Sequence, residues 1–187
     1  RYAFDVAETS AEPQRVSDIY SMFVISAIFD TPLDYDYLAR PLQLRPSTLE
    51  AMPEISADGM TYTLRVKPGI YFDDDPAFGG KKRELVAEDY VYSLKRIMDP
   101  RLASPMLGEI EGVIVGSDEA LAKARKANRL DYDAPIEGLK ALDRYTWQIR
   151  LTKPFYTFIY NLADCRLSCA VAREVVERYG DDVGAHP

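Results

Sequence analysis

The sequence predicts an α+β fold in which mostly antiparallel β hairpins carry helices on one face. Two hairpin patterns and one amphipathic helix support this prediction. The first hairpin turns at Asp58-Gly59, after which residues 60–67 alternate apolar and polar side chains. The second joins residues 136–142 to residues 145–151, and the helix is expected over residues 87–98. With 187 residues, 47% of them hydrophobic, the chain is long enough to bury a sizeable core.

The N-terminal part is expected to form a strand and then a helix. Residues 2–7 alternate weakly and suit a strand, and a polar loop follows over residues 8–16. Ser17 is a suitable cap for the next helix, Asp18 suits its first turn, and Thr31-Pro32 ends it. The helix is apolar on nearly all sides, which predicts packing against a body larger than one thin layer.

The segment between this helix and the helix at 87–98 is predicted to contain short strands and loops. Residues 34–46 suit a mixed loop and short strands, and Pro68-Gly69 turns the chain into a short return over residues 70–72. The loop at 73–84 is charged and begins with three adjacent aspartates. A calcium loop alternates its ligands and ends in a distant glutamate, so we expect a solvated surface loop instead.

Helices are predicted at several later points in the chain. The helix at 87–98 has an apolar stripe, acidic residues at its start and basic residues near its end, which complement the helix dipole. Residues 117–126 predict an exposed, alanine-rich helix. Pro154 is placed to open a helix whose apolar residues recur at helical spacing over residues 155–162. A last amphipathic helix ends at Gly180.

The residue inventory argues against catalysis, nucleic-acid binding and a cofactor. The net charge of −7 is the wrong sign for binding phosphate backbones. Phosphate-binding, dinucleotide and zinc-protease motifs are absent, and His186, the single histidine, stands near the end of the chain in a segment of linker character. Cys165 and Cys169 are too few for a metal site. We expect two buried or half-buried thiols, with a disulfide as the alternative.

Three segments resemble the family 5 extracellular solute-binding proteins, the oligopeptide- and dipeptide-type receptors of ABC importers. The resemblance is carried by residues 87–96 (AEDYVYSLKR) with Asp99-Pro100, by residues 56–69 (SADGMTYTLRVKPG), and by residues 138–154, which include GLKALD and LTKP. Residues 175–187 are similar to the approach to a later segment of the family. Two departures stand out: the loop at 73–84 is longer than usual, and Val86 replaces a frequent threonine cap.

The resemblance implies part of a two-lobe periplasmic binding protein of type II-like architecture. Family members are much longer, so it also implies an N-terminal fragment from which the second lobe is absent. Residues 1–40 would be the first segment of lobe I, residues 41–169 a small subdomain, and residues 170–187 the return into lobe I. The implied function is capture of a peptide or similar small solute by lobe closure and delivery to a membrane permease, in the periplasm or outside the cell. The alternative is a stand-alone, non-catalytic α+β interaction module.

By analogy with the family, two segments would reach the ligand cleft. One contains Ser17 and Asp18, and the other contains Ser104 and Met106. Peptide-binding members often carry an aromatic residue at the position of Met106, so the methionine here weakens the argument for ordinary peptide specificity. The alternative interpretation is that both segments are connecting loops. A truncated lobe would also expose apolar surface, so self-association is expected.

Overall fold

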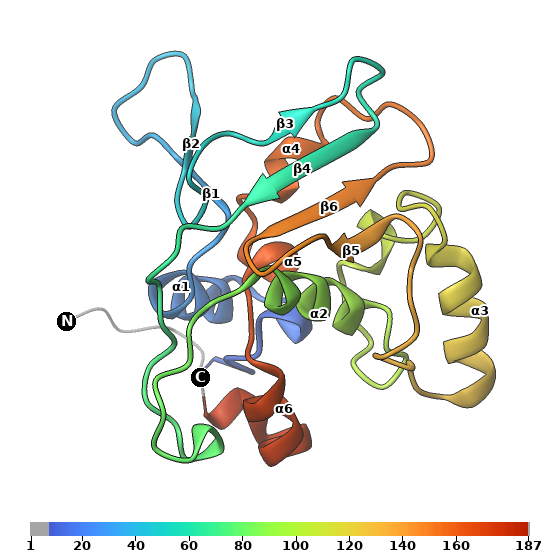
Figure 1. Cartoon of the computed structure of the whole chain (residues 1–187). Helices are drawn as coiled ribbons and strands as arrows, with labels where there is room; N and C mark the ends of the chain where they lie inside the picture. Colours follow the sequence, from blue (N-terminus) through green and yellow to red (C-terminus); the bar gives the residue numbers. More distant parts are fainter. Residues whose placement is uncertain (1–7, 187) are drawn as a thin grey trace.

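The computed structural model of this chain describes residues 8–186 and contains a four-stranded antiparallel sheet. The sheet order is β3-β4-β6-β5, formed by β3 (Glu54–Ile55), β4 (Thr61–Arg65), β6 (Thr146–Arg150) and β5 (Leu139–Ala141) (Figure 1). The α+β prediction is confirmed, and so are both hairpins. The strand predicted over residues 2–7 lies outside the described residues.

The pairing of β4 with β6 follows from their alternating side chains. Tyr62 lies opposite Ile149 and Leu64 opposite Trp147, and all four side chains are at most 2% exposed. A shift of one residue would turn this apolar set toward solvent, so burial fixes the register. Two hairpins that lie far apart in the sequence thereby meet at the centre of one sheet.

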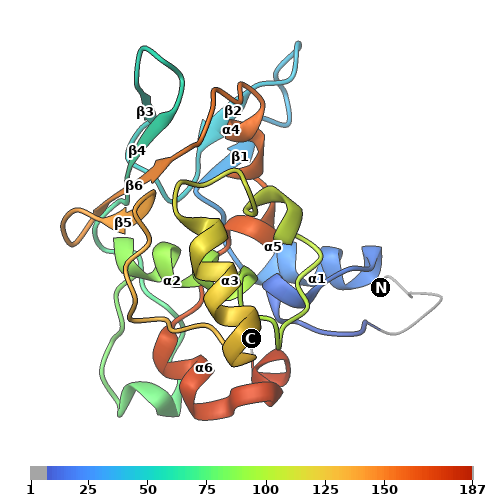
Figure 2. The same cartoon turned by 90° about the vertical axis from the view of Figure 1, so that its right-hand side faces the viewer.

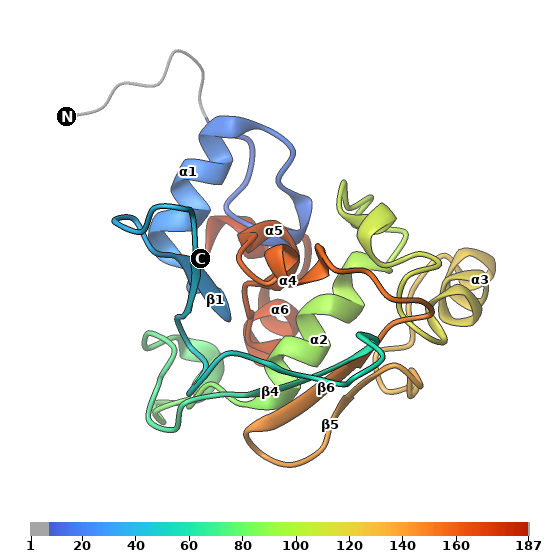
Figure 3. The same ribbon diagram turned by 90° about the horizontal axis from the view of Figure 1, so that it is seen from above.

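Helix α2 (Ala87–Ile97) covers one face of this sheet (Figures 1 and 3). The Tyr90 ring stacks on the Trp147 indole at a centroid distance of 5.1 Å and an interplanar angle of 6°. The Tyr90 hydroxyl also shares a 2.5 Å hydrogen bond with Thr48, which is buried. Val86 is the N-cap residue and provides no side-chain cap. Its N–H donates to the carboxylate of Asp89, the third residue of the helix, at 2.8 Å, which is one half of a capping box. The predicted helix is therefore confirmed, and Asp89 supplies the polar contact at its start.

A second, two-stranded sheet consists of β1 (Leu33–Tyr35) and β2 (Leu44–Pro46). The loop between them contains a cis Arg40-Pro41 peptide and exposes Tyr37 and Leu38, which are 84% and 82% accessible. In Figure 1 this hairpin projects from the body beside the main sheet. It corresponds to the short strands expected within residues 34–46.

On the far side of α2 lies a layer formed by η1 (Pro13–Arg15), α1 (Ile19–Ile28) and the single-turn helix α5 (Cys165–Ser168). The first helix was expected to pack against a body larger than one thin layer. Instead it buries only Ser21 and Ile25 and exposes Ile19, Phe23 and Ile28 at 57%, 59% and 47%. The partners that its apolar faces require are not among the described residues.

Cys165 and Cys169 form a disulfide with a Cα–Cα distance of 4.6 Å. The expectation that both side chains are buried is right, and the expectation of free thiols is wrong. The helix ends at Ser168, and Cys169 has an extended backbone with ψ of 131°. Residues four apart on a regular helix rise by about 6 Å along its axis, and this departure from helical geometry brings the two Cα atoms closer than that.

The helix predicted over residues 155–162 is shorter in the structure. Only α4 (Phe158–Asn161) is helical. Residues 154–157 form a turn in which the Phe155 carbonyl accepts from Phe158 N–H at 2.9 Å and from the Tyr62 hydroxyl at 3.4 Å. A turn followed by one helical turn can also place the apolar residues of this segment toward the core. Their spacing therefore did not require a helix over residues 155–162.

The remaining elements complete the surface. Helix α3 (Ser117–Ala127) was expected to be exposed, but it buries Ser117, Leu121 and Ala124 on one side. Helix α6 (Arg173–Tyr179) ends at Gly180, as predicted, and continues into η4 (Gly180–Ala185). Short 3-10 turns lie at η2 (Pro76–Phe78) and η3 (Leu107–Glu109). Within residues 8–186, no helix has both the length and the apolar character needed to cross a bilayer.

Candidate functional site

The segment before α1 is held in place by Asp18. Its carboxylate accepts hydrogen bonds from the Ser21 N–H at 2.8 Å and from the Thr9 hydroxyl at 2.5 Å. The Ser21 hydroxyl in turn accepts from the Thr9 N–H at 2.9 Å. The backbone hydrogen bond from Ser21, followed by the hydroxyl of Thr9, lowers the pKa of Asp18 to about 2. Asp18 therefore carries its negative charge at every physiological pH.

The structure corrects the expected roles of the two residues at this helix start. Asp18, and not Ser17, is the N-cap, because Asp18 has an extended backbone and a side chain that accepts from the Ser21 N–H of the first turn. Ser17 is exposed and lies between Asp18 and the fully buried Val16. Both oxygens of Asp18 have partners in the chain, so the group best placed to meet a ligand here is Ser17.

The second predicted segment, the turn after α2, is more deeply packed than expected. Ser104 and Met106 are 7% and 8% exposed, and Met106 belongs to the main hydrophobic core. The Ser104 hydroxyl accepts from the Met106 N–H at 3.3 Å, which closes the turn. Ala103 adopts a positive φ of 49° and is exposed, as is Pro105. This turn therefore exposes its backbone to solvent and keeps the Met106 side chain buried.

The two predicted segments lie toward the same side of the molecule. Figures 2 and 3 both place the loop before α1 and the loop after α2 on the side away from the viewer of Figure 1. No hydrogen bond or ion pair among the described residues joins Ser17 or Asp18 to Ser104 or Met106. The structure thus places the two segments on a common side, without a hydrogen bond or ion pair between these four described residues.

Two features near this site were not predicted from the sequence. Gln14 is fully buried and its amide donates to the Cys169 carbonyl at 3.2 Å. Glu12 and Arg96, 3% and 4% exposed, form a buried ion pair that joins η1 to the last turn of α2. Both contacts join residues more than 80 positions apart, so no local pattern in the sequence could have revealed them.

A cavity of about 290 Å³ lies next to the buried ion pair. Its lining includes Glu12 and Arg96, the aromatic residues Phe72 and Phe78, and Val176 of α6. None of the four predicted ligand-binding residues lines it. The cavity and the predicted site are therefore separate features of the molecule.

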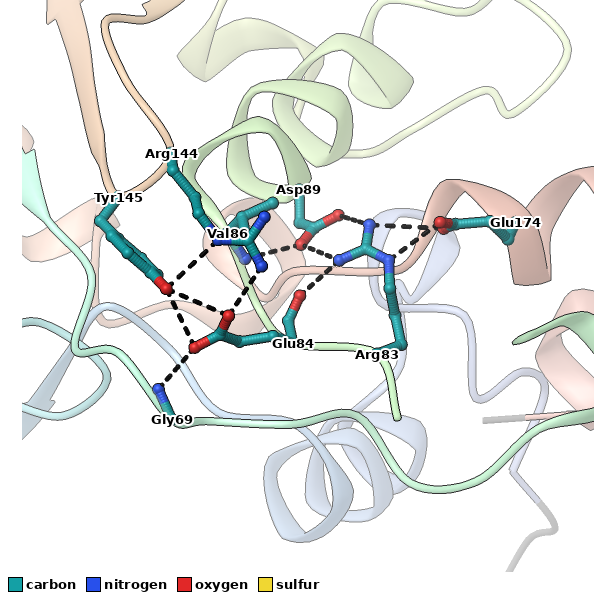
Figure 4. A network of polar contacts seen from close by, with 8 residues as sticks. All are labelled: Gly69, Arg83, Glu84, Val86, Asp89, Arg144, Tyr145 and Glu174. Atoms are coloured by element: carbon teal, nitrogen blue, oxygen red, sulfur yellow. Dashed lines mark hydrogen bonds and ion pairs between the residues drawn. The ribbon is translucent and has the colours of Figure 1, made fainter. Parts of the chain in front are cut away.

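A network of charged residues ties the start of α2 to α6 (Figure 4). The Arg83 guanidinium donates to both oxygens of Asp89, at 2.6 and 3.0 Å, and to Glu174 at 2.9 Å. Burial opposes the charge on Arg83, yet these hydrogen bonds outweigh it and raise the pKa of Arg83 above its ordinary value. Every strong donor in the network has an acceptor within the chain. The network therefore ties the start of α2 to α6.

An adjoining part of the network holds the second hairpin. Glu84 accepts from Arg144 at 2.7 Å, from the Gly69 N–H at 2.7 Å and from the Tyr145 hydroxyl at 3.1 Å (Figure 4). The hydrogen bond from Arg144 and that from Gly69 lower the pKa of Glu84. The contacts fix the turn at Asp143-Arg144 beside the Pro68-Gly69 turn. Their role, like that of Arg83, is structural.

Comparison with known proteins matches residues 43–183 to a family described as bacterial extracellular solute-binding proteins, family 5 middle. The chain is 24% identical over 179 residues to the glutathione-binding protein GsiB of Pectobacterium atrosepticum, covering 96% of this chain. It is 26% identical over 173 residues to the periplasmic oligopeptide-binding protein OppA of Escherichia coli, covering 92% of this chain. The chain spans 28% of the length of each relative.

Solved structures give the same fold. A periplasmic oligopeptide-binding protein from Borrelia burgdorferi matches with a TM-score of 0.74 and 25% identity, over 94% of this chain and 31% of the other. The binding protein DppA from Helicobacter pylori, solved with the peptide STSA, matches with a TM-score of 0.73 and 23% identity, over 96% and 33%. The fold described above is thus that of one part of a larger two-lobe architecture.

Proposed function

The chain belongs to family 5 of the bacterial extracellular solute-binding proteins, and on this premise we propose that it forms part of the substrate-binding component of an ABC importer. The observation that supports this most is the family match over residues 43–183. The named relatives bind peptides or glutathione. The proposal assigns the chain a binding role and no catalytic step.

The proposed mechanism is capture of a peptide or similar small solute between two lobes, followed by delivery to a membrane permease. Residues 1–40 and 170–187 would belong to one lobe, and residues 41–169 to a small subdomain beside it. The central sheet and α2 fall wholly within the proposed subdomain. The Arg83–Glu174 ion pair would then tie the subdomain to the lobe.

In this proposal the two loops on one side of the molecule line part of the ligand cleft. Ser17 offers an exposed hydroxyl and main chain, while Asp18 fixes the shape of the segment and adds negative charge. Ser104 and Met106 contribute through the backbone of their turn, because their side chains are buried. A ligand that carries a positive charge near Asp18 would be favoured over one that carries a negative charge there.

The proposed location is the periplasm or the cell exterior. Two arguments support it: the oligopeptide-binding relative from Escherichia coli is periplasmic by name, and the Cys165–Cys169 bridge suits an oxidising compartment. The exposed apolar residues of α1 also support self-association of this chain when it is produced by itself.

A thermal-shift screen tests the proposed function. A ligand that binds only the folded state stabilises it by about 2.7 kcal/mol when the free ligand concentration is about a hundred times the dissociation constant. Such a stabilisation raises the thermal unfolding midpoint by several degrees. We expect pools of short peptides to raise the melting midpoint of the whole gene product that contains this chain. The same pools should leave residues 1–187 alone unchanged, because this chain supplies only part of the cleft. A shift in the 187-residue chain equal to that of the whole product would contradict the two-lobe mechanism.

A further inference from the structure

The disulfide lies directly beneath the segment that carries Ser17 and Asp18. Cys165 and Cys169, 7% and 0% exposed, form one hydrophobic cluster with Val16 and Ile25. Val16 precedes Ser17, and Ile25 is the apolar residue that α1 buries. Val16, before Ser17 and Asp18, and Ile25, after them, therefore pack in the same hydrophobic cluster as the disulfide.

A single hydrogen bond adds to this packing. The Gln14 amide donates to the Cys169 carbonyl at 3.2 Å, and the Gln14 side chain is fully buried. Its other polar atom, Oε1, has no partner among the described residues. A buried amide with one partner is sensitive to the loss of that partner. The position of Gln14 thus depends on the direction of the Cys169 carbonyl.

That direction is set by a very short helix. Helix α5 has four residues, a length at which helices do not form independently in water. Asp164 caps its start by accepting from Arg166 N–H at 3.0 Å, and Cys169 N–H donates to the Cys165 carbonyl at 3.1 Å at its end. The bridge joins the first residue of this turn to the residue that follows it. It is the one covalent restraint on the turn apart from the chain itself.

We propose that the Cys165–Cys169 bridge is a positioning element for the Ser17–Asp18 segment. The bridge holds α5 as a closed turn, the turn directs the Cys169 carbonyl at Gln14, and Gln14 with Val16 fixes the approach to α1. The description of Ser17 and Asp18 as ligand-binding rests on the proposed function. The positioning of the segment by the bridge is independent of the proposed function.

Hydrogen exchange read by mass spectrometry tests the proposal without a ligand. The protein is compared in three states: oxidised, refolded in dithiothreitol, and re-oxidised with oxidised glutathione. In the reduction, the dithiol supplies two electrons and two protons, the S–S bond becomes two thiols, and the dithiol closes to a cyclic disulfide. In the re-oxidation, two thiols and one oxidised glutathione yield the bridge and two reduced glutathiones. Alkylation and mass measurement count the thiols in each state.

We expect reduction to speed exchange of the amides at residues 14–21 roughly tenfold or more, a change equivalent to about 1.4 kcal/mol. Amides of β4 and β6 should stay within about twofold, because the sheet lies on the other side of α2. Re-oxidation should restore the slow rates. Unchanged exchange at residues 14–21 would overturn the proposal. So would an equal increase in β4 and β6, which would show that the bridge acts on global stability only.

The variant Cys165→Ser/Cys169→Ser is the matched control. It should exchange as fast at residues 14–21 as the reduced protein, and dithiothreitol should have no further effect on it. Fast exchange in this variant combined with slow exchange in the reduced protein would overturn the proposal, because it would assign the effect to sulfur packing. The result is independent of the proposed function: a protein that binds no solute in any state would contradict that function and leave the exchange measurement intact.

Discussion

Removing the Arg83 side chain should destabilise the protein more than removing any exposed arginine. Arg83 is the main counter-charge for Asp89, whose side chain is only 3% exposed, and it also binds Glu174. In Arg83→Ala the Asp89 carboxylate stays buried with one remaining donor, the Val86 N–H. Loss of one partner of a buried pair costs about 3–5 kcal/mol. Because Arg83 itself keeps 21% exposure, we take the lower end, about 3 kcal/mol, or roughly a 150-fold shift in the unfolding equilibrium.

Urea unfolding followed by tryptophan fluorescence provides the assay. Trp147 is the only tryptophan, and it is fully buried in the centre of the sheet, so its emission reports on the core. Arg45→Ala is the matched control, because Arg45 pairs with Asp34 at 2.9 Å but both side chains are about half exposed. That control should leave the urea midpoint unchanged within error.

A second variant separates the loss of the Arg83–Asp89 ion pair from the cost of leaving the Asp89 carboxylate buried without a counter-charge. In Arg83→Met/Asp89→Asn neither substituted position carries a charge, so much of the lost stability should return. The reasoning is refuted if Arg83→Ala shifts the midpoint no more than Arg45→Ala does. It is also refuted if the double variant is as unstable as Arg83→Ala.

Three further outcomes are expected. Tyr90→Phe removes the hydroxyl bonded to buried Thr48 and should cost about 1 kcal/mol in urea unfolding, with the Trp147 stack intact. The Thr48 hydroxyl still donates to the Thr31 carbonyl at 3.2 Å, and a neutral result would show that the Tyr90 hydroxyl adds no stability. The pKa of Asp18 is lowered to about 2 from 3.8, so the stabilisation by its carboxylate is complete above about pH 4 and is lost as the pH falls to 2. The difference in urea midpoint between the protein and Asp18→Asn should therefore shrink over that pH range. A constant difference would count against Asp18 as the helix cap. Phe23→Ser should reduce self-association in sedimentation, since Phe23 is 59% exposed, and an unchanged association constant would place the contact elsewhere.

The sequence was most informative where local pattern and burial agree. The alternation of residues 60–67 predicted β4, and the apolar stripe and polarised ends of residues 87–98 predicted α2. The Asp58-Gly59 turn and the stop at Gly180 also matched, because turn and cap residues act through their own backbone. These elements form the part of the fold that carries the family resemblance.

The sequence was less informative where long-range contacts decide the outcome. The spacing of Phe155 and Phe158 suits a helix, but the hydrogen bond from Tyr62 to the Phe155 carbonyl belongs to a turn. The four-residue spacing of Cys165 and Cys169 suited buried thiols on a helix, but α5 ends at Ser168, Cys169 has an extended backbone, and the two Cα atoms are 4.6 Å apart. The first outcome depends on a residue distant in the chain, and the second on the point at which a single helical turn ends.

The candidate site was predicted by resemblance, and its geometry was not. The sequence indicated Ser17 as the cap, whereas the structure gives that role to Asp18 and leaves Ser17 exposed. Burial of Ser104 and Met106 depends on the core beneath them, which no local pattern describes. Whether these four residues contact a solute stays a prediction.

Isothermal titration of the whole gene product is the most direct test of solute capture. We predict saturable one-site binding for at least one peptide pool, with a negative heat-capacity change from burial of apolar surface in the closed cleft. Ser17→Arg should weaken that binding at least tenfold without changing the melting midpoint of the free protein, because Ser17 is exposed. Flat titrations with peptides, nickel chelates and sugars would contradict the assignment of this chain to a solute importer.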